Sequence, residues 1–154
     1  DDLTGLSNKR AFSTHLEGVL SRARHEEFPV TLIFIDIDNF KQCNDTQGHQ
    51  AGDEVLSAFG KLARKSIRKG ADQAFRYGGD EFAVLLVNAE ANIGIRIADR
   101  MRTEFSNMPN YNTSLSIGVA QFEQDMHAAA LVRAADQALY KAKAAGKNQV
   151  VLAS

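Results

Sequence analysis

The stretch RYGGDEFAVLL, residues 76–86, has a short alternating apolar run on either side of a glycine pair. This pattern predicts two strands joined by a tight hairpin, because glycine readily supplies the positive φ angles of the favoured turns. Asp80 and Glu81 follow the glycines, at the hairpin tip or just beyond it. Charge at a turn usually serves solubility alone, so a chemical role for this pair requires partners elsewhere in the chain.

The composition limits what those partners are. The chain has 154 residues and 44% hydrophobic content, enough for a single domain with its own core over residues 1–154. A formal net charge of −1 argues against nucleic acid or an anionic membrane as the main partner. The single cysteine, Cys43, excludes an internal disulfide and a cysteine zinc site, and the four histidines form no HxH or HExxH pattern.

The sequence also bears on where the protein works. No apolar run approaches the roughly 20 residues of a membrane span, and no signal peptide is visible. The chain opens at Asp1 without a methionine. We therefore expect a cytoplasmic module cut from a longer protein, whose missing segments would decide any membrane anchoring.

Helical periodicity and β-branched runs alternate along the chain. Helices are expected over residues 8–25, 39–46, 51–68, 91–105 and 128–145, and strands over residues 28–38, 74–77, 82–87, 113–122 and 148–152. The first strand is almost continuously apolar, which is typical of a central strand buried on both faces. The interleaving of the two kinds of element predicts an α/β (α+β) fold with a mixed central sheet.

Carboxylates follow the core of this central strand. The run LIFIDID ends in Asp36 and Asp38, and ligands commonly bind outside the carboxyl ends of strands in open α/β sheets. If the hairpin lies beside this strand, Asp36 and Asp80 converge, with Glu81 adjacent. Carboxylates without histidine or thiolate suit Mg²⁺. The alternative for a single residue here is a helix N-cap, a role open to Asp38 or Asn39.

Five sequence blocks together resemble one known family. They are DDLTGLSNKR (1–10), DIDNFKQCND (36–45), GHQAGDEVL (48–56), RYGGDEF (76–82) and DQALYKAKAAGKN (136–148). In order and spacing they are similar to the GGDEF domain family, the diguanylate cyclases that make cyclic di-GMP from two GTP. The resemblance implies a palm-like sheet topology, as in nucleotide cyclases and polymerases, with helices packed around the sheet.

The resemblance implies a metal site with two Mg²⁺ (or Mn²⁺) ions. Asp36 would bind through its carboxylate, Ile37 through its backbone carbonyl, and Asp80 from the hairpin. Glu81 would be either a ligand of the second metal or the base that deprotonates the ribose 3′-hydroxyl. Two metals at a phosphoryl centre can stabilise both the attacking and the leaving oxygen.

Phosphate binding is implied at two further places. The backbone N–H groups of Phe40 and Lys41 would hold the β- and γ-phosphates, since a helix start is a natural anion site. Lys41 would also add charge near the leaving pyrophosphate. Lys143 and Lys147 match the family's phosphate-binding positions, although the second is more often arginine, and alone they would read as a solvated helix end. Gly79 would leave no Cβ to obstruct the nucleotide.

Guanine recognition is implied for three residues. Asp53 matches the carboxylate that accepts from the guanine N1–H and amino group, and Asn44 resembles its helper. His49 lies between them, near the base or ribose, or else it merely packs. Adenine offers no such pair of donors, so GTP is expected as the only substrate.

The product implies an assembly. One domain holds one GTP, whereas cyclic di-GMP requires two linkages, so two domains must face each other as a homodimer. An upstream sensory or regulatory domain would control this dimerisation. The main alternative is a catalytically silent GGDEF module that binds GTP or cyclic di-GMP and signals through conformation. A polymerase-type palm is disfavoured because the chain lacks a basic surface.

A degenerate inhibitory site completes the expectations. Many members of the family carry an RxxD motif that binds the product, and here the motif reads KGAD, with Lys69 and Asp72 at the key positions. Lysine lacks the planar fork of arginine, so weak or absent product inhibition is expected. Arg68 is one residue out of register and would point roughly 100° away if a helix ends here.

Overall fold

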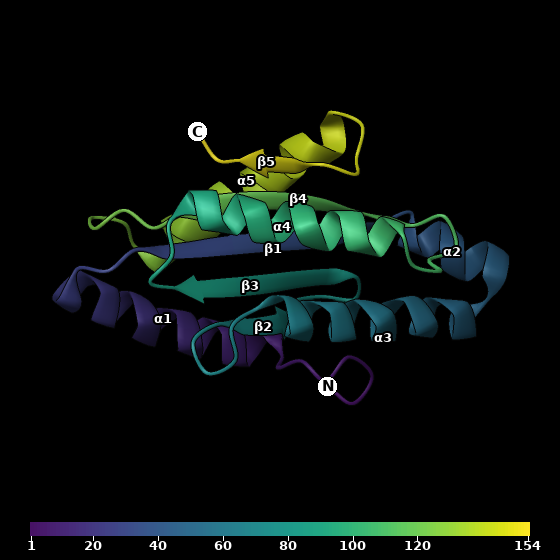
Figure 1. The fold of residues 1–154 in the computed structure, drawn as a ribbon, viewed down its shortest axis with the longest axis horizontal. Helices are drawn as coiled ribbons and strands as arrows, with labels where there is room; N and C mark the ends of the chain where they lie inside the picture. The colour runs from purple at the N-terminus through teal and green to yellow at the C-terminus, as the bar shows by residue number, and fades with distance from the viewer.

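A single five-stranded sheet forms the centre of the computed structural model, which describes residues 1–154 (Figure 1). The elements in chain order are α1 (Lys9–Glu26), β1 (Val30–Asp38), α2 (Phe40–Gln47), α3 (His49–Ser66), β2 (Gln73–Arg76), β3 (Glu81–Val87), α4 (Ala91–Ser106), β4 (Ser114–Gln121), α5 (Ala128–Ala144) and β5 (Val150–Leu152). The expected interleaving of helices and strands is confirmed. Most boundaries differ from the expected ones by one or two residues.

The sheet is mixed, as predicted, with strand order β2-β3-β1-β4-β5. The central strand β1 runs antiparallel to both β3 and β4, whereas β4 and β5 are parallel. Residues 30–35 of β1 are all buried, at 4% exposure or less, as expected for a strand covered on both faces. Because β1 and β3 are antiparallel, the C-terminal end of β1 lies next to the start of β3.

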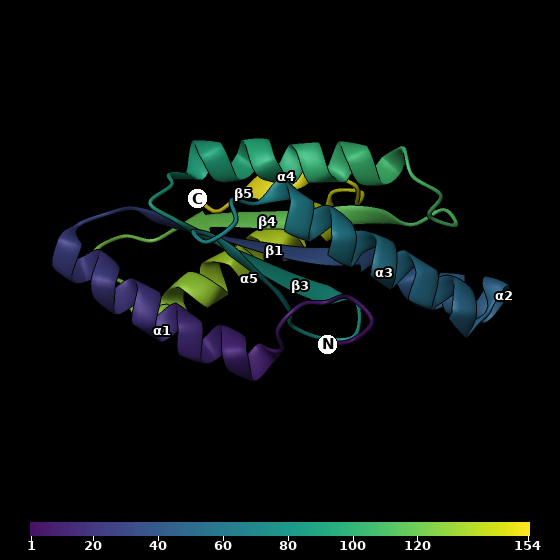
Figure 2. The ribbon, with the colours of Figure 1, turned by 60° about the horizontal axis from the view of Figure 1, so that its bottom comes forward.

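Helices cover both faces of the sheet and create two separate cores (Figure 2). On one face α3 and α4 pack on the sheet, and the rings of Phe59 and Phe82 lie 4.3 Å apart. On the other face α1 and α5 pack on it, and the rings of Phe12 and Phe75 lie 5.3 Å apart. Alternating side chains of β3 serve the two cores in turn. None of the helices has both the length and the apolar character needed to cross a membrane.

The hairpin between β2 and β3 forms where it was predicted, but not for the predicted reason. Neither Gly78 nor Gly79 has a positive φ. The turn is closed instead by the carbonyl of Glu81, which accepts from the N–H groups of Tyr77 (2.8 Å) and Gly78 (3.0 Å). A Cβ on Gly78 would lie 2.9 Å from the Glu81 Oε1, whereas a Cβ on Gly79 would project into open space. The glycines keep the tip clear of side chains.

Candidate active site

The acidic residues of β1 and the hairpin lie side by side. Asp36 is the register partner of Glu81 across the β1–β3 pair. The next residue of β1, Ile37, donates its backbone N–H to the carbonyl of Asp80 at 3.1 Å. Residues 43 and 45 positions apart in the chain therefore meet at one end of the sheet, which is the juxtaposition that the strand and hairpin patterns required.

The surroundings of Asp36 disfavour the charged form of its carboxyl group. Burial raises its pKa to about 6, and the neighbouring carboxylates Asp80 and Glu81 push in the same direction. Lys143 opposes them, with its Nζ 3.1 Å from the Asp36 Oδ2. The other oxygen, Oδ1, is buried and has no hydrogen-bond partner. A buried carboxylate oxygen without a partner is suited to a cation.

The donor set fits Mg²⁺ completed by a substrate. No group of three or more histidine, cysteine, aspartate or glutamate side chains is arranged to hold a metal by itself. Mg²⁺ does not need one, because it commonly takes one or two carboxylates together with water and substrate phosphates. Asp36, the Ile37 carbonyl and Asp80 match such a partial set in kind, and these residues lie at the same end of the sheet. Their role as ligands stays a prediction.

Asp38 does not cap a helix, so that alternative is wrong for Asp38; Asn39 occupies the N-cap position of α2. Its side chain is completely buried and accepts from the hydroxyls of Ser114 (2.7 Å) and Ser116 (2.6 Å) and from the backbone N–H of Asn148 (3.1 Å). Lys143 lies 3.3 Å from its Oδ1. Sequence reasoning missed both serines. Their only signal is alternation in the run TSLSIGV, which places them on one face of β4.

The residues expected to bind phosphate gather around the start of α2. Asn39 precedes this helix in a left-handed conformation (φ 63) and makes no side-chain capping bond, so the N–H groups of Phe40 and Lys41 are uncapped. Lys147 donates from its Nζ to the Asn39 Oδ1 at 3.1 Å. Lys143 approaches from the last turn of α5. The structure thus brings the two lysines to the same end of the sheet as the acidic cluster.

The residues expected to recognise guanine lie on α2 and α3. The Asn44 Oδ1 is buried without a partner, and a Cβ on Gly52 would overlap it. Gly52, which sequence reasoning missed, therefore makes the space that Asn44 occupies. The neighbouring Asp53 is exposed and free to accept from a ligand. His49, the first residue of α3, is also exposed, so the alternative that it merely packs is wrong.

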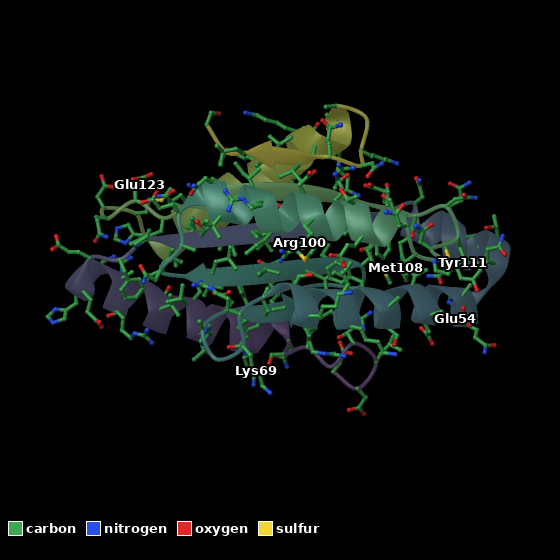
Figure 3. All side chains as sticks on the ribbon, in the orientation of Figure 1. Glu54, Lys69, Arg100, Met108, Tyr111 and Glu123 are labelled. Atoms are coloured by element: carbon green, nitrogen blue, oxygen red, sulfur yellow. The ribbon has the colours of Figure 1, made fainter.

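A loop closes over this end of α3. The Tyr111 hydroxyl donates to the Glu54 Oε2 at 2.6 Å, and Figure 3 shows the two side chains together near the junction of α2 and α3. The Glu54 carboxylate raises the pKa of Tyr111 through this hydrogen bond. The contact connects the segment after α4 to the helix that carries Asp53.

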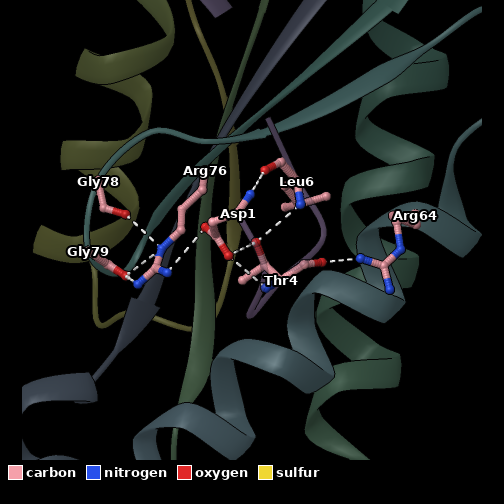
Figure 4. A network of polar contacts seen from close by, with 7 residues as sticks. All are labelled: Asp1, Thr4, Leu6, Arg64, Arg76, Gly78 and Gly79. Carbon is pink, nitrogen blue, oxygen red and sulfur yellow. Dashed lines mark hydrogen bonds and ion pairs between the residues drawn. The ribbon is translucent and has the colours of Figure 1, made fainter. Parts of the chain in front are cut away.

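An arginine braces the hairpin tip (Figure 4). Arg76 donates to the carbonyl of Gly79 at 2.7 Å and, from another nitrogen, to the Asp1 carboxylate at 3.3 Å. Asp1 in turn accepts from the N–H (2.7 Å) and hydroxyl (2.9 Å) of Thr4, whose carbonyl accepts from Arg64. This network ties the first residues of the chain to the hairpin and was not foreseen.

The degenerate inhibitory motif has a different geometry from the one expected. Helix α3 ends at Ser66, so Arg68 lies outside the helix and the helical offset of roughly 100° does not apply to it. Its Nε and Nη2 hold the Asp72 carboxylate at 2.9 and 2.8 Å, and the N–H of Val87 donates to the same group at 3.1 Å. Lys69 is exposed and makes no bond to Asp72; Figure 3 shows it on the loop between α3 and β2.

The mixed sheet thus carries an acidic cluster at a strand end, with uncapped N–H groups and lysines beside it. A family model described as "Diguanylate cyclase, GGDEF domain" matches residues 1–149. The chain belongs to the GGDEF domain family.

Curated relatives agree with this assignment. The chain is 42% identical over 151 residues to diguanylate cyclase DgcS of Shewanella oneidensis, an alignment that covers 96% of this chain and 50% of that protein. It is 38% identical over 159 residues to diguanylate cyclase DosC of Escherichia coli, covering 99% and 34%. The response regulator PleD of Caulobacter vibrioides is 39% identical over 160 residues, covering 98% and 35%. The chain therefore spans half or less of these relatives.

Solved structures confirm the fold. The coiled coil and GGDEF domain of DgcB from Caulobacter crescentus, in complex with c-di-GMP, superposes with a TM-score of 0.94 at 30% identity and covers 99% of this chain and 84% of that one. The active GGEEF domain of a diguanylate cyclase from Vibrio cholerae gives a TM-score of 0.91 at 35% identity, covering 97% and 98%.

Proposed function

We propose that this domain is a diguanylate cyclase, which condenses two GTP into cyclic di-GMP and two pyrophosphates with Mg²⁺. The observation that supports it most directly is the buried, unpartnered Oδ1 of Asp36 opposite Glu81 in an otherwise intact GGDEF hairpin. The printed names of the DgcS and DosC relatives support the same activity.

The metal site is proposed on the chain's own oxygen donors. Asp36, the carbonyl of Ile37 and Asp80 would hold Mg²⁺ or Mn²⁺, two ions per site. When bound, the ions would supply positive charge to the phosphoryl transfer. Lys143 already pairs with Asp36 at 3.1 Å, which offsets part of the acidic charge before any ion arrives.

Phosphate positioning is proposed at α2 and the end of α5. The uncapped N–H groups of Phe40 and Lys41 donate to the β- and γ-phosphates, and the helix dipole favours this charge. The side chains of Lys41, Lys143 and Lys147 add positive charge where the pyrophosphate leaves. Gly79 leaves open space above the hairpin for the triphosphate.

Guanine selection is proposed for the α2–α3 junction. Asp53 accepts from the guanine N1–H and amino group, and the unpartnered Asn44 Oδ1 accepts a further hydrogen bond. His49 contributes from the exposed start of α3. Adenine would leave these acceptors without donors, so GTP is preferred.

The reaction needs two domains. In each, the ribose 3′-oxygen attacks the α-phosphorus of the GTP bound opposite, a new P–O bond forms, and the bond to pyrophosphate breaks. The 3′-hydroxyl proton leaves either to Glu81 acting as base or to solvent, with Glu81 then a ligand of the second metal. Catalysis is accordingly controlled by dimerisation, through regulatory segments in the longer protein.

The test is incubation of the domain with GTP and Mg²⁺, with pyrophosphate and cyclic di-GMP followed together. We expect both products in a two-to-one ratio and none from ATP. A demonstrably dimeric preparation that binds GTP but makes no product would instead identify a silent module that signals by binding GTP or cyclic di-GMP.

A further inference from the structure

Asp38 is one of only two charged residues in the protein interior; the other is Asp72. Asp72 has its own cation, because Arg68 holds both of its oxygens. The only cation near Asp38 is Lys143, 3.3 Å away. Removing a carboxylate from water is unfavourable unless it is paired, so the charge of Asp38 and the ammonium of Lys143 depend on each other.

Lys143 has a second carboxylate, and the two differ in kind. Asp36 keeps 19% of its side-chain surface exposed, and its buried Oδ1 has no hydrogen-bond partner, whereas Asp38 is fully buried and each of its oxygens has partners. A cation bound at Asp36 would repel the ammonium and compete for that carboxylate. Asp38 is closed to solvent, so it would remain a partner of Lys143 when a cation occupies Asp36.

Asp38 also holds the loop that follows α5. It accepts from the backbone N–H of Asn148, and the loop there has a left-handed conformation at Lys147 (φ 66) and Asn148 (φ 49). This turn places Lys147 where its Nζ donates a hydrogen bond to the Oδ1 of Asn39, at the start of α2. One buried carboxylate therefore contacts the side chain of one lysine and the backbone next to the other.

We propose that Asp38 is a positioning residue for the triphosphate: it holds Lys143, and the turn bearing Lys147, at the phosphate end of the site without itself binding metal or substrate. The inference rests on the proposed function, in which these lysines contact the phosphates. It predicts that removing the charge of Asp38 weakens phosphate binding while leaving guanosine binding intact.

The test compares a triphosphate with a nucleoside. 3′-Deoxy-GTP lacks the attacking hydroxyl, so it binds without turnover, and guanosine lacks phosphates. In calorimetry with Mg²⁺ we expect Asp38→Asn to weaken 3′-deoxy-GTP binding about tenfold, the usual effect of losing a charge-assisted contact, and guanosine binding less than twofold. The control is Ser116→Ala, which keeps the ion pair; it should lower stability but not the ratio of the two affinities.

A double-mutant cycle separates positioning from a merely structural role. In a Lys143→Gln background, Asp38→Asn should cause less than a twofold further loss of 3′-deoxy-GTP affinity, because Lys143 is already neutral and the introduced amide oxygen can still accept the backbone N–H of Asn148. The double variant removes both charges together, so this comparison remains available if Asp38→Asn alone fails to fold.

The outcomes are distinct. Equal losses for 3′-deoxy-GTP and guanosine, no loss for either, or a further tenfold loss in the Lys143→Gln background would each overturn the positioning role while leaving the cyclase proposal standing. Failure of the unmodified domain to bind 3′-deoxy-GTP at all would overturn both. Expected losses confined to the triphosphate, and absent from the Lys143→Gln background, support the proposal.

Discussion

Gly118 of β4 lies directly under the peptide nitrogen of Leu139 in α5, so closely that a Cβ on the glycine would overlap it. The backbone of the helix thus rests on the backbone of the strand. Four residues further along α5, just over one turn, the helix presents Lys143 to Asp36. The short distance between β4 and α5 at Gly118 therefore brings Lys143 close to Asp36.

Gly118→Ala should therefore be destabilising and should weaken nucleotide binding. The added methyl group pushes α5 off the sheet, at a cost of about 1–3 kcal/mol in the free energy of unfolding, and withdraws Lys143. Urea unfolding and 3′-deoxy-GTP calorimetry measure the two effects. The matched control is Gly18→Ala on the exposed face of α1, where nothing lies within 4 Å. The Gly18→Ala change should raise the free energy of unfolding by about 0.5–1 kcal/mol and leave 3′-deoxy-GTP binding unaltered. Unchanged stability of Gly118→Ala would contradict the close contact.

Asp36→Asn should stabilise the metal-free domain at neutral pH. The pKa of Asp36 is raised from its ordinary value of 3.8 to about 6. Between these values the unfolded chain has released a proton that the folded domain retains, so the wild type loses stability as pH rises through this window. Asparagine has no proton to lose. The gain in free energy of unfolding of Asp36→Asn over the wild type should develop between pH 3.8 and about 6 and stay constant at higher pH.

The shift corresponds to about 3 kcal/mol, which solvent screening at this partly exposed site reduces to about 1–2 kcal/mol. Urea unfolding from pH 4 to pH 8 in the presence of a chelator measures it. Asp125→Asn, at an exposed loop residue without an ion pair, is the matched control. If Asp36→Asn and the wild type differ in free energy of unfolding by the same amount at pH 4 and at pH 8, the pKa of Asp36 is not elevated.

Asp80→Asn should abolish cyclic di-GMP formation while preserving the fold. The Asp80 side chain has no hydrogen bond or ion pair within the protein, and its carbonyl still accepts from Ile37 in the variant. We expect turnover to fall at least about 100-fold, since charge stabilisation at the reacting phosphate is lost, with little change in melting temperature. Product formation is followed by chromatography. Near-normal turnover would show that the metal assignment is incorrect.

The specific activity of the isolated domain should rise with protein concentration. Productive encounters join two domains, so in the range where the protein is monomeric a doubling of concentration should raise the total rate about fourfold. Initial rates measured alongside light scattering provide the check. A total rate strictly proportional to concentration over that range would rule out the facing dimer.

Cyclic di-GMP should bind weakly, if at all, at Lys69 and Asp72. Arg68 and the N–H of Val87 already use both oxygens of Asp72, and Lys69 supplies a point charge without a fork. Calorimetry should show no submicromolar binding, and Lys69→Arg should strengthen it, whereas Lys61→Arg on the exposed side of α3 should not. Submicromolar affinity in the unmodified domain, lost in Asp72→Ala, would mean that Arg68 releases the carboxylate to the ligand.

The parts of the fold predictable from sequence are those written into local periodicity. The apolar run that became β1 and the helical periodicity that became α1 both formed within two residues of their expected bounds. Helix α3 begins earlier than expected, at His49, because Gly48 (φ 92) alone separates it from α2. A positive φ at one glycine suffices for that break, and the hydrophobic pattern carries no trace of it.

Features that depend on distant residues escaped prediction. Asp38 reads as a helix cap because its serine partners lie 76 and 78 residues further along the chain. Arg68 was expected to point roughly 100° away from the direction of Lys69 if a helix ended here, whereas the chain turns at Ile67 into extended backbone. Local propensity describes neither situation, since both are decided by which strands come to lie beside each other.

The brace between Arg76, Asp1 and the Gly79 carbonyl has a consequence for the thermodynamics of ligand binding. A glycine-rich tip left to itself samples many conformations, and a ligand that orders it forfeits part of its binding free energy. Here the tip carbonyl is already held by a guanidinium that is itself anchored to the start of the chain. The loss of conformational freedom is incurred when the domain folds, so an incoming nucleotide meets a hairpin that is preorganised.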